Sequence, residues 1–172
     1  LLRHGESEAN IAHIFAGRII DPALTAVGRG QARLQGMALR DVPFQAIYAS
    51  TLRRAQETAG IVGQALGLQP ILTNDLREVD LGSLDGRCYD DRVLWSVFED
   101  VLARWQDREY GAGFPDGETL HDMQVRLARF LAALPHTGRP ILLVGHEVVF
   151  MVAIWLFCRN VGASMLDWRL RH

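Results

Sequence analysis

The sequence contains no lysine, so every one of its 18 basic residues is an arginine. The 20 acidic residues slightly outnumber them, and the formal net charge is −2. A balance this close to neutral provides no general attraction to nucleic acid or to an anionic membrane, and we expect neither as a partner. A site for an anion must therefore be built locally from a few arginines, whose planar guanidinium groups match the oxygens of a phosphate.

Cysteine and long apolar runs are also scarce. Cys88 and Cys158 supply neither a disulfide framework nor a cluster of zinc ligands, which fits a reducing compartment such as the cytoplasm. The longest apolar run, residues 148–158, has 11 residues, too few to span a bilayer, and is typical of a buried helix. The chain begins without methionine and inside a strand-like run, so we expect further residues upstream; nothing visible suggests a signal peptide.

The 172 residues suffice for one domain with a substantial core, and we expect a single domain over residues 1–172. Short apolar runs, typical of buried parallel strands, alternate with segments of helical periodicity. This alternation predicts a three-layer α/β/α sandwich around a mainly parallel sheet. The expected strands are 1–2, 46–49, 70–72 and 141–144, and the expected helices are 25–40, 51–66, 120–134 and 148–158.

Residues 84–115 interrupt the alternation of strands and helices. Aromatic residues are scattered there among charged ones, and the pattern predicts a helix over residues 90–108. We interpret the segment as a small helical cap inserted over the strand ends. A crossover helix whose aromatic residues belong to the core is an equally good interpretation for most of them, namely Tyr89, Trp95, Phe98, Trp105 and Tyr110.

Two histidines follow strand-like runs near opposite ends of the chain. His4 comes directly after the first run, and His146 follows the run at 141–144. Parallel strands end at a common edge of the sheet, where open α/β sheets bind ligands, so both imidazoles are expected on one rim. With Arg3 beside them they would form a cationic pocket suited to a phosphoryl group. A single histidine at a strand end is more often structural, so this pattern alone leaves both interpretations open.

Six segments of the chain stand out together: LRHGESEAN (2–10), GRIIDPALTAVGRGQA (17–32), ASTLRRAQETA (49–59), LREVDLGSLDG (76–86), PDGETL (115–120) and VGH (144–146). They resemble the motifs of the histidine phosphatase superfamily, which includes the cofactor-dependent phosphoglycerate mutases. Arg-His-Gly alone would be a weak signal, but six segments in the family's order are a strong one. The resemblance covers essentially the whole chain and implies a phosphoglycerate mutase-like fold.

The resemblance implies a role for each of five residues. His4 would be the nucleophile, which forms a phosphohistidine. Arg3 and Arg54 would hold the phosphoryl oxygens, with Arg54 chosen over its neighbour Arg53 because it directly precedes alanine. Glu78 would protonate the leaving oxygen and later activate water. His146 would donate a hydrogen bond to the phosphoryl group as charge develops in the transition state.

Further positions carry weaker implications. Ser7 and Asn10 match positions that donate to the bound phosphate or substrate, although local capping of the first loop is almost as good an interpretation. Asp80 is the alternative to Glu78 as the acid. Glu6 and Glu118 are expected to be structural, holding arginines or helix starts.

No metal or cofactor is expected. His146-Glu147 begins like a His-Glu-x-x-His zinc motif, but Phe150 stands where the second histidine would be. His13, His121, His136 and His172 have no ligand spacing and are expected at the surface or in the core. No G-x-G-x-x-G separates a strand from a helix, so a dinucleotide site is not expected either.

Departures from the mutase pattern favour a phosphatase. Glu78 and Glu118 lie only 40 positions apart (118 − 78), whereas mutases carry a longer insertion there. Leu81 replaces the mutase tyrosine, and residues 83–117 contain no adjacent arginine pair. We therefore expect a metal-independent phosphomonoester hydrolase that acts on a small phosphorylated metabolite through a phosphohistidine. Mutase-type phosphoryl transfer is the alternative, followed by a non-catalytic member that binds a phosphorylated ligand or a protein, because Glu147 replaces the usual glycine.

Neither the substrate nor the oligomeric state follows from the sequence. Three arginines could meet a second anionic group of the substrate or could simply lie on the surface: Arg18, Arg87 and Arg92. Apolar residues near the C-terminal end could form a homodimer contact, although core packing is the more common role: Trp155, Met165, Leu166 and Trp168.

Overall fold

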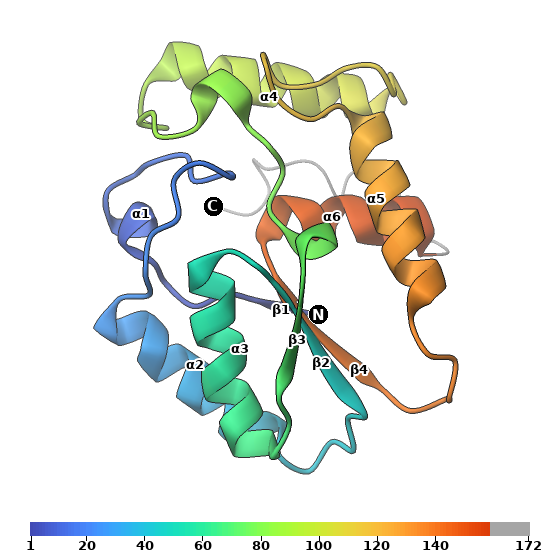
Figure 1. The fold of residues 1–172 in the computed structure, drawn as a ribbon. Coiled ribbons are helices and arrows are strands. Elements are labelled where there is room, and N and C mark those ends of the chain that lie inside the picture. The colour runs from blue at the N-terminus through green and yellow to red at the C-terminus, as the bar shows by residue number, and fades with distance from the viewer. Residues whose placement is uncertain (159–172) are drawn as a thin grey trace.

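A computed structural model describes residues 1–158 of the chain. Its sheet has four parallel strands in the order β1-β4-β2-β3 (Figure 1). The strands are β1 (Leu2–Arg3), β2 (Ala46–Ser50), β3 (Pro70–Thr73) and β4 (Ile141–Gly145). The predicted parallel sheet is therefore confirmed, and each strand lies within two residues of its expected position. Within residues 1–158, the first and last strands, β1 and β4, are neighbours in this sheet.

The sheet is covered by helices on both faces because its strands are apolar on both sides. Ile47 and Ala49 pack in one cluster with Ala59 and Val62 of α3 (Arg53–Leu66). Tyr48, between them, packs in the other cluster, which holds residues of α5 (Leu120–Ala133) and α6 (Glu147–Phe157). This alternation follows from the period of two in a strand. It produces the expected three-layer sandwich, in which α2 (Ala26–Leu39) packs against α3.

The helices begin where their N-terminal N–H groups find acceptors. The hydroxyl of Thr25 accepts from the backbone of Gly28 and caps α2 at the predicted position. The helix expected from residue 51 begins instead at Arg53, whose backbone N–H donates to the Asp21 carboxylate at 2.7 Å. Among residues 1–158, no helix combines the length and the apolar character needed to cross a membrane.

The segment interpreted as a cap contains α4 (Arg92–Gln106), which Asp91 caps through the N–H groups of Val93 and Leu94. Figure 1 shows α4 at the end of the molecule beyond the carboxyl ends of the strands. The aromatic residues of this segment divide between the core and a pocket. Trp105 is fully buried in the core cluster, whereas Trp95 is half-buried and lines a pocket. The remaining short helices are α1 (Glu8–Ile11) and the 3-10 turns η1 (Asn74–Leu76) and η2 (Gly82–Leu84).

Candidate active site

The neighbouring strands β1 and β4 bring the two histidines together. Arg3 pairs with Gly145 in the parallel register, and the backbone N–H of His4 donates to the carbonyl of Gly145 at 2.9 Å. The His4 and His146 rings consequently lie with their centroids 5.1 Å apart, at the carboxyl end of the sheet. Residues 142 positions apart in sequence (146 − 4) thus share one site, as the sequence pattern predicts.

The hydrogen bonds of His4 select one neutral form of its ring. Nδ1 lies 2.7 Å from the carbonyl oxygen of Gly5 and must donate its hydrogen there, because a carbonyl can only accept. Nε2 accepts from Nε of Arg54 at 3.2 Å and so carries the lone pair. Burial and then the Arg54 charge lower the pKa of His4 from 6.5 to about 3. The ring of His4 is therefore unprotonated at neutral pH.

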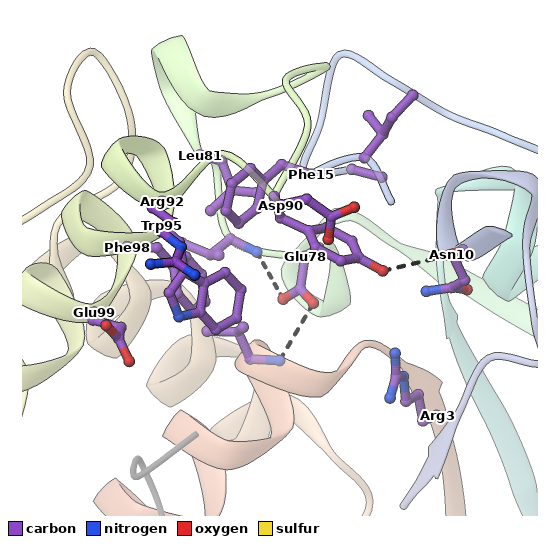
Figure 2. Close-up of a pocket in the computed structure, with 15 residues that line it drawn as sticks. Arg3, Asn10, Phe15, Glu78, Leu81, Asp90, Arg92, Trp95, Phe98 and Glu99 are labelled. Atoms are coloured by element: carbon purple, nitrogen blue, oxygen red, sulfur yellow. Dashed lines mark hydrogen bonds between the residues drawn. The ribbon is translucent and has the colours of Figure 1, made fainter. Parts of the chain in front are cut away.

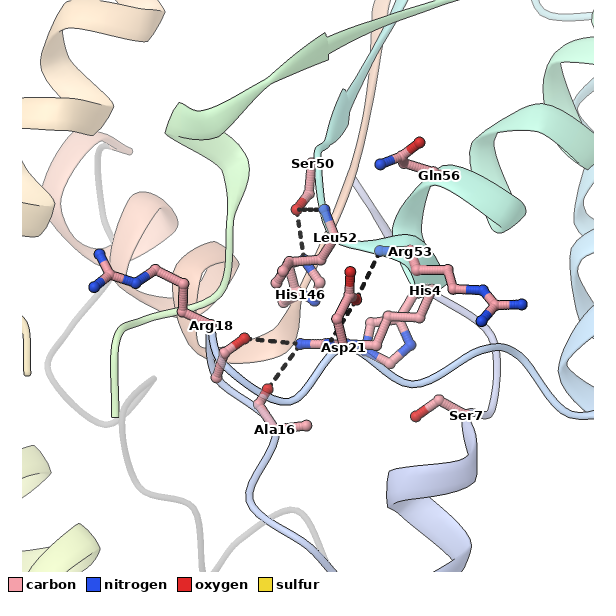
Figure 3. A network of polar contacts seen from close by, with 12 residues as sticks. His4, Ser7, Ala16, Arg18, Asp21, Ser50, Leu52, Arg53, Gln56 and His146 are labelled. Carbon is pink, nitrogen blue, oxygen red and sulfur yellow. Dashed lines mark hydrogen bonds and ion pairs between the residues drawn. The ribbon is translucent and has the colours of Figure 1, made fainter. Parts of the chain in front are cut away.

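Arg54 is buried beside this ring, with 2% of the residue exposed. Besides its contact with His4, it donates to the carbonyl of Ala16 at 2.7 Å (Figure 3). Its third nitrogen is buried without a hydrogen-bond partner in the described part of the chain, 3.7 Å from a carboxylate oxygen of Asp21. Such an unsatisfied buried donor is suited to an anion. Arg53 points away, is exposed, and pairs with Glu57 at 2.8 Å, as expected.

His146 is fully buried, and its Nε2 lies 2.8 Å from the hydroxyl of Ser50 at the end of β2 (Figure 3). Its Nδ1 has no hydrogen-bond partner among the described residues. Burial, followed by the positive charge of Arg54, lowers the pKa of His146 well below its usual value. His146 is therefore neutral in the free site.

Glu78 is held by the backbone at the start of α6. One carboxylate oxygen accepts from the N–H groups of Val79 and Val149, both at 3.0 Å, and the other from Val148 at 3.3 Å. Figure 2 shows two of these contacts as dashed lines at Glu78. Burial raises the pKa of Glu78, while these N–H donors and Arg54 oppose the rise. A carboxyl group with a raised pKa can carry a proton to a leaving group near neutral pH.

The carboxylate of Asp80, the alternative acid, has partners of its own. Its carboxylate pairs with Arg18 at 2.9 Å and accepts from the backbone of Gly82 at 3.1 Å. Arg3, in contrast, lies beside the histidines and forms an ion pair with Glu147, the residue after His146. Arg3 and Glu78 both line the two pockets described below, whereas the contacts of Asp80 are structural.

Ser7 and Asn10 form the local cap that was their alternative interpretation. The backbone N–H and the hydroxyl of Ser7 both donate to the side-chain oxygen of Asn10 at 2.9 Å, and both residues also line the small pocket described below. Glu6 accepts from the Thr25 hydroxyl at 2.7 Å, and Glu118 holds Arg126 at 2.6 Å. The last two contacts are structural, as the sequence predicts.

Two adjoining pockets open at this rim. A polar one of about 90 Å³ is lined by His4, Arg54 and Glu147 among others. A larger one of about 910 Å³ is walled by cap and loop aromatics, including Phe15 and Trp95 (Figure 2). The two share part of their lining: Arg3, Asn10, Ile14, Ala16 and Glu78. The arrangement suits a phosphoryl group in the small pocket and its organic part in the large one.

Three residues that the sequence pattern does not single out complete the site: Ser50, Thr58 and Asp21. The hydroxyl of Thr58 accepts from the backbone of Gly5 at 3.1 Å and donates to the carbonyl of Arg54 at 2.8 Å, which joins the loop after His4 to α3. Ser50 and Thr58 stand inside the segment ASTLRRAQETA, and Asp21 inside GRIIDPALTAVGRGQA. Their positions inside these segments could have drawn attention to them. Neither their charge nor their spacing in the sequence indicates which residues they contact.

The other residues considered from the sequence have ordinary surroundings. Within residues 1–158, no three His, Cys, Asp or Glu side chains gather so that they could hold a metal ion. His13 pairs with Asp90 at 2.8 Å, and His121 and His136 are exposed. Arg92 lines the large pocket and Arg87 is exposed. Trp155 is buried in the core, while His172, Met165, Leu166 and Trp168 lie outside the described residues.

Comparison with known proteins places this geometry in a family. The chain is 38% identical over 148 residues to the 2,3-bisphosphoglycerate-dependent phosphoglycerate mutase of Methylobacterium sp. (strain 4-46), covering 83% of this chain and 66% of that protein. It is 34% identical over 134 residues to "Putative phosphoserine phosphatase 2" of Hydrogenobacter thermophilus, covering 76% and 63% respectively. The chain thus spans about two thirds of the length of these curated relatives.

A solved structure and a family model agree with this placement. The crystal structure of "a putative alpha-ribazole-5'-P phosphatase" from Escherichia coli superposes with a TM-score of 0.76 at 28% identity, covering 96% of this chain and 81% of that one. The model of the histidine phosphatase superfamily (branch 1) matches residues 1–171. The chain therefore belongs to the histidine phosphatase superfamily.

Proposed function

We propose that the protein is a metal-independent phosphomonoester hydrolase that forms a phosphohistidine at His4. The observation that carries the proposal is the tautomer of His4: Nδ1 donates to a backbone carbonyl, and Nε2 presents its lone pair beside the buried guanidinium of Arg54. A neutral imidazole held in this way is ready to attack phosphorus without prior loss of a proton.

In the first half of the reaction, Nε2 of His4 attacks phosphorus as the bond from phosphorus to the ester oxygen breaks. Arg3 and Arg54 balance the negative charge on the phosphoryl oxygens, which is the main source of catalysis in phosphoryl transfer. Glu78 gives its proton to the departing oxygen, so the alcohol leaves neutral and Glu78 becomes a carboxylate.

In the second half, water replaces the alcohol. Glu78 takes a proton from the water as its oxygen attacks phosphorus, and the phosphorus–nitrogen bond to His4 breaks. Inorganic phosphate leaves, neutral His4 is regenerated, and Glu78 is again protonated. His146 lies against His4, and we assign the contact with the transferred group to its Nδ1, which has no hydrogen-bond partner among the described residues.

The larger pocket supports a small organic substrate. Its volume of about 910 Å³ lies in the range of sites for small molecules, and its walls combine aromatic side chains with Asp90, Arg92 and Glu99 at the edge. The two free cysteines, Cys88 and Cys158, fit a reducing compartment such as the cytoplasm, which we include in the proposal. A homodimer stays a prediction.

Phosphoglycerate mutase activity is the second candidate because the relative at 38% identity is named as a mutase. Both activities share the phosphohistidine and differ in what removes the phosphoryl group. We favour water because the position before Gly82 holds Leu81, which is buried in the core and offers no polar group to a retained bisphosphate.

The test is phosphate release from para-nitrophenyl phosphate in excess EDTA, by the wild-type chain and by His4→Ala. The proposal expects release that resists the chelator and that disappears in the variant. Release that EDTA abolishes, or that survives in His4→Ala, would reject the mechanism. Isomerisation of 3-phosphoglycerate by the wild-type chain, in the absence of phosphate release, would instead assign mutase activity.

A further inference from the structure

The small pocket contains a carboxylate that the proposed chemistry does not use. Glu147, the first residue of α6, lines this pocket together with His4 and Arg54, and its side chain is only 16% exposed. Its carboxylate forms an ion pair with the guanidinium of Arg3. Arg3, which lines the pocket proposed for the phosphoryl group, is therefore already paired with a carboxylate.

Glu147 differs in its surroundings from Glu78, the other carboxylate of the pocket. Glu78 accepts from three backbone N–H groups, and two of them, those of Val148 and Val149, tie it to the start of α6. Glu147 instead directs its carboxylate to Arg3. The N-terminus of a helix carries partial positive charge, which favours an acidic residue in the first turn, but that benefit does not require a partner in the pocket.

Arg3 is the more adaptable of the two arginines that face the small pocket. Arg54 is fixed by contacts with His4 and with the backbone of Ala16, and it is almost fully buried. The side chain of Arg3 is 46% exposed and reaches both pockets. Arg3 can therefore exchange a carboxylate for a phosphate without loss of a buried backbone contact.

We propose that Glu147 is a specificity-determining residue that competes with the phosphoryl group for Arg3. The proposal rests on the proposed function, since it assumes that the small pocket binds phosphate. Each binding event must exchange the ion pair with Glu147 for one with phosphate, and the displaced carboxylate still faces the incoming anion. Glu147 thereby weakens phosphate binding, speeds release of the inorganic product, and disfavours retention of a phosphorylated intermediate for transfer to a second substrate.

Calorimetric titration with inorganic phosphate tests the proposal without reliance on turnover. We expect Glu147→Gln, which keeps the size of the side chain and removes its charge, to lower the dissociation constant for phosphate by roughly tenfold. Glu147→Ala should act in the same direction and serves as a second variant. Glu109→Gln is the matched control: it also uncouples a glutamate from an arginine, Arg104, but at a surface outside both pockets.

The role of Arg3 is tested by combining substitutions. In an Arg3→Gln background, Glu147→Gln should change phosphate binding by much less than in the wild-type chain, because the cation at issue is absent. If Glu147→Gln lowered the dissociation constant for phosphate as much in the Arg3→Gln background as in the wild-type chain, the competition for Arg3 would be rejected. Unchanged, weaker or undetectable phosphate binding in both Glu147 variants, with unfolding curves like the wild type, would overturn the proposal as a whole.

The calorimetric result is separable from the failure of the proposed function. If phosphate binds more tightly to Glu147→Gln while the wild-type chain hydrolyses no phosphomonoester, the competition at Arg3 stands and hydrolysis is rejected. If hydrolysis depends on His4 but both Glu147 variants bind phosphate like the wild-type chain, hydrolysis stands and the competition is rejected.

Discussion

Nε of Arg54 donates to Nε2 of His4 across 3.2 Å, a contact between the first turn of α3 and the loop after β1. Burial lowers the pKa of His4 most, and the charge of Arg54 lowers it further. In the proposed reaction the same guanidinium would face the negative charge of the phosphoryl group. Thr58 reinforces the pair, because its hydroxyl bonds to the backbone of both Gly5 and Arg54. The contacts that fix the position of His4 therefore also hold the charge of Arg54 beside it.

Arg54→Gln should reduce kcat/KM for para-nitrophenyl phosphate by roughly 100- to 1,000-fold, because a preorganised cation next to phosphorus is lost. Arg53→Gln is the control, since Arg53 is exposed and contacts Glu57 instead of the pocket. Steady-state kinetics, with unfolding curves to confirm that each variant folds, would measure both. Equal losses in the two variants would contradict the assignment of Arg54.

Glu78→Gln should affect substrates according to their leaving groups. An alkyl phosphate needs a proton on its departing oxygen, so its turnover should fall by about 100- to 10,000-fold. Nitrophenolate leaves without a proton, so the variant should release it in a rapid burst before slow hydrolysis of the phosphohistidine. Stopped-flow absorbance measures the burst. Asp80→Asn should show no such dependence. An equally rapid first turnover of both substrates in Glu78→Gln would speak against Glu78 as the acid.

The free energy of unfolding should decrease as pH falls below 6.5. The pKa of His4 is about 3 in the folded chain and 6.5 in the unfolded chain, so between these values the unfolded state binds the additional proton. His146 acts in the same direction, because burial lowers its pKa too. Urea unfolding at a series of pH values measures the slope.

The contribution of His4 can be isolated by substitution. His4→Gln should flatten the pH dependence between about 3 and 6.5, the interval in which the folded ring resists protonation. Glu78 contributes with the opposite sign, since its raised pKa makes the folded state bind the extra proton. The comparison is therefore made in a Glu78→Gln background. An unchanged slope after removal of His4 would show that its ring titrates normally in the folded chain.

Ser50→Ala should lower both stability and activity. Ser50 and His146 are fully buried, and the substitution leaves Nε2 of His146 without its partner at 2.8 Å. An unsatisfied buried group costs about 1–3 kcal/mol. Urea unfolding and kcat/KM would measure the two effects. Ser96→Ala, at an exposed serine of α4, is the control, and a similarly small effect of both substitutions would show that Ser50 does not orient the ring.

The alternation of apolar strands with amphipathic helices was enough to predict the parallel sandwich. It succeeded because the inner strand β2 is apolar on both sides, as shown by Ile47 and Tyr48, which pack against opposite layers. Boundaries were less predictable. The start of α3 at Arg53 depends on the Asp21 carboxylate, 32 positions earlier, and no local pattern encodes that contact.

The sequence by itself determined which chemical groups are available: two histidines at strand ends, a glutamate and arginines in motif segments. Only the tertiary structure decided how they are used. The order of the strands places His4 beside His146, the backbone at the start of α6 holds Glu78, and Arg3 is paired with Glu147. The physical reason is that tautomer, burial and charge pairing depend on distances between residues remote in sequence, which no local periodicity specifies.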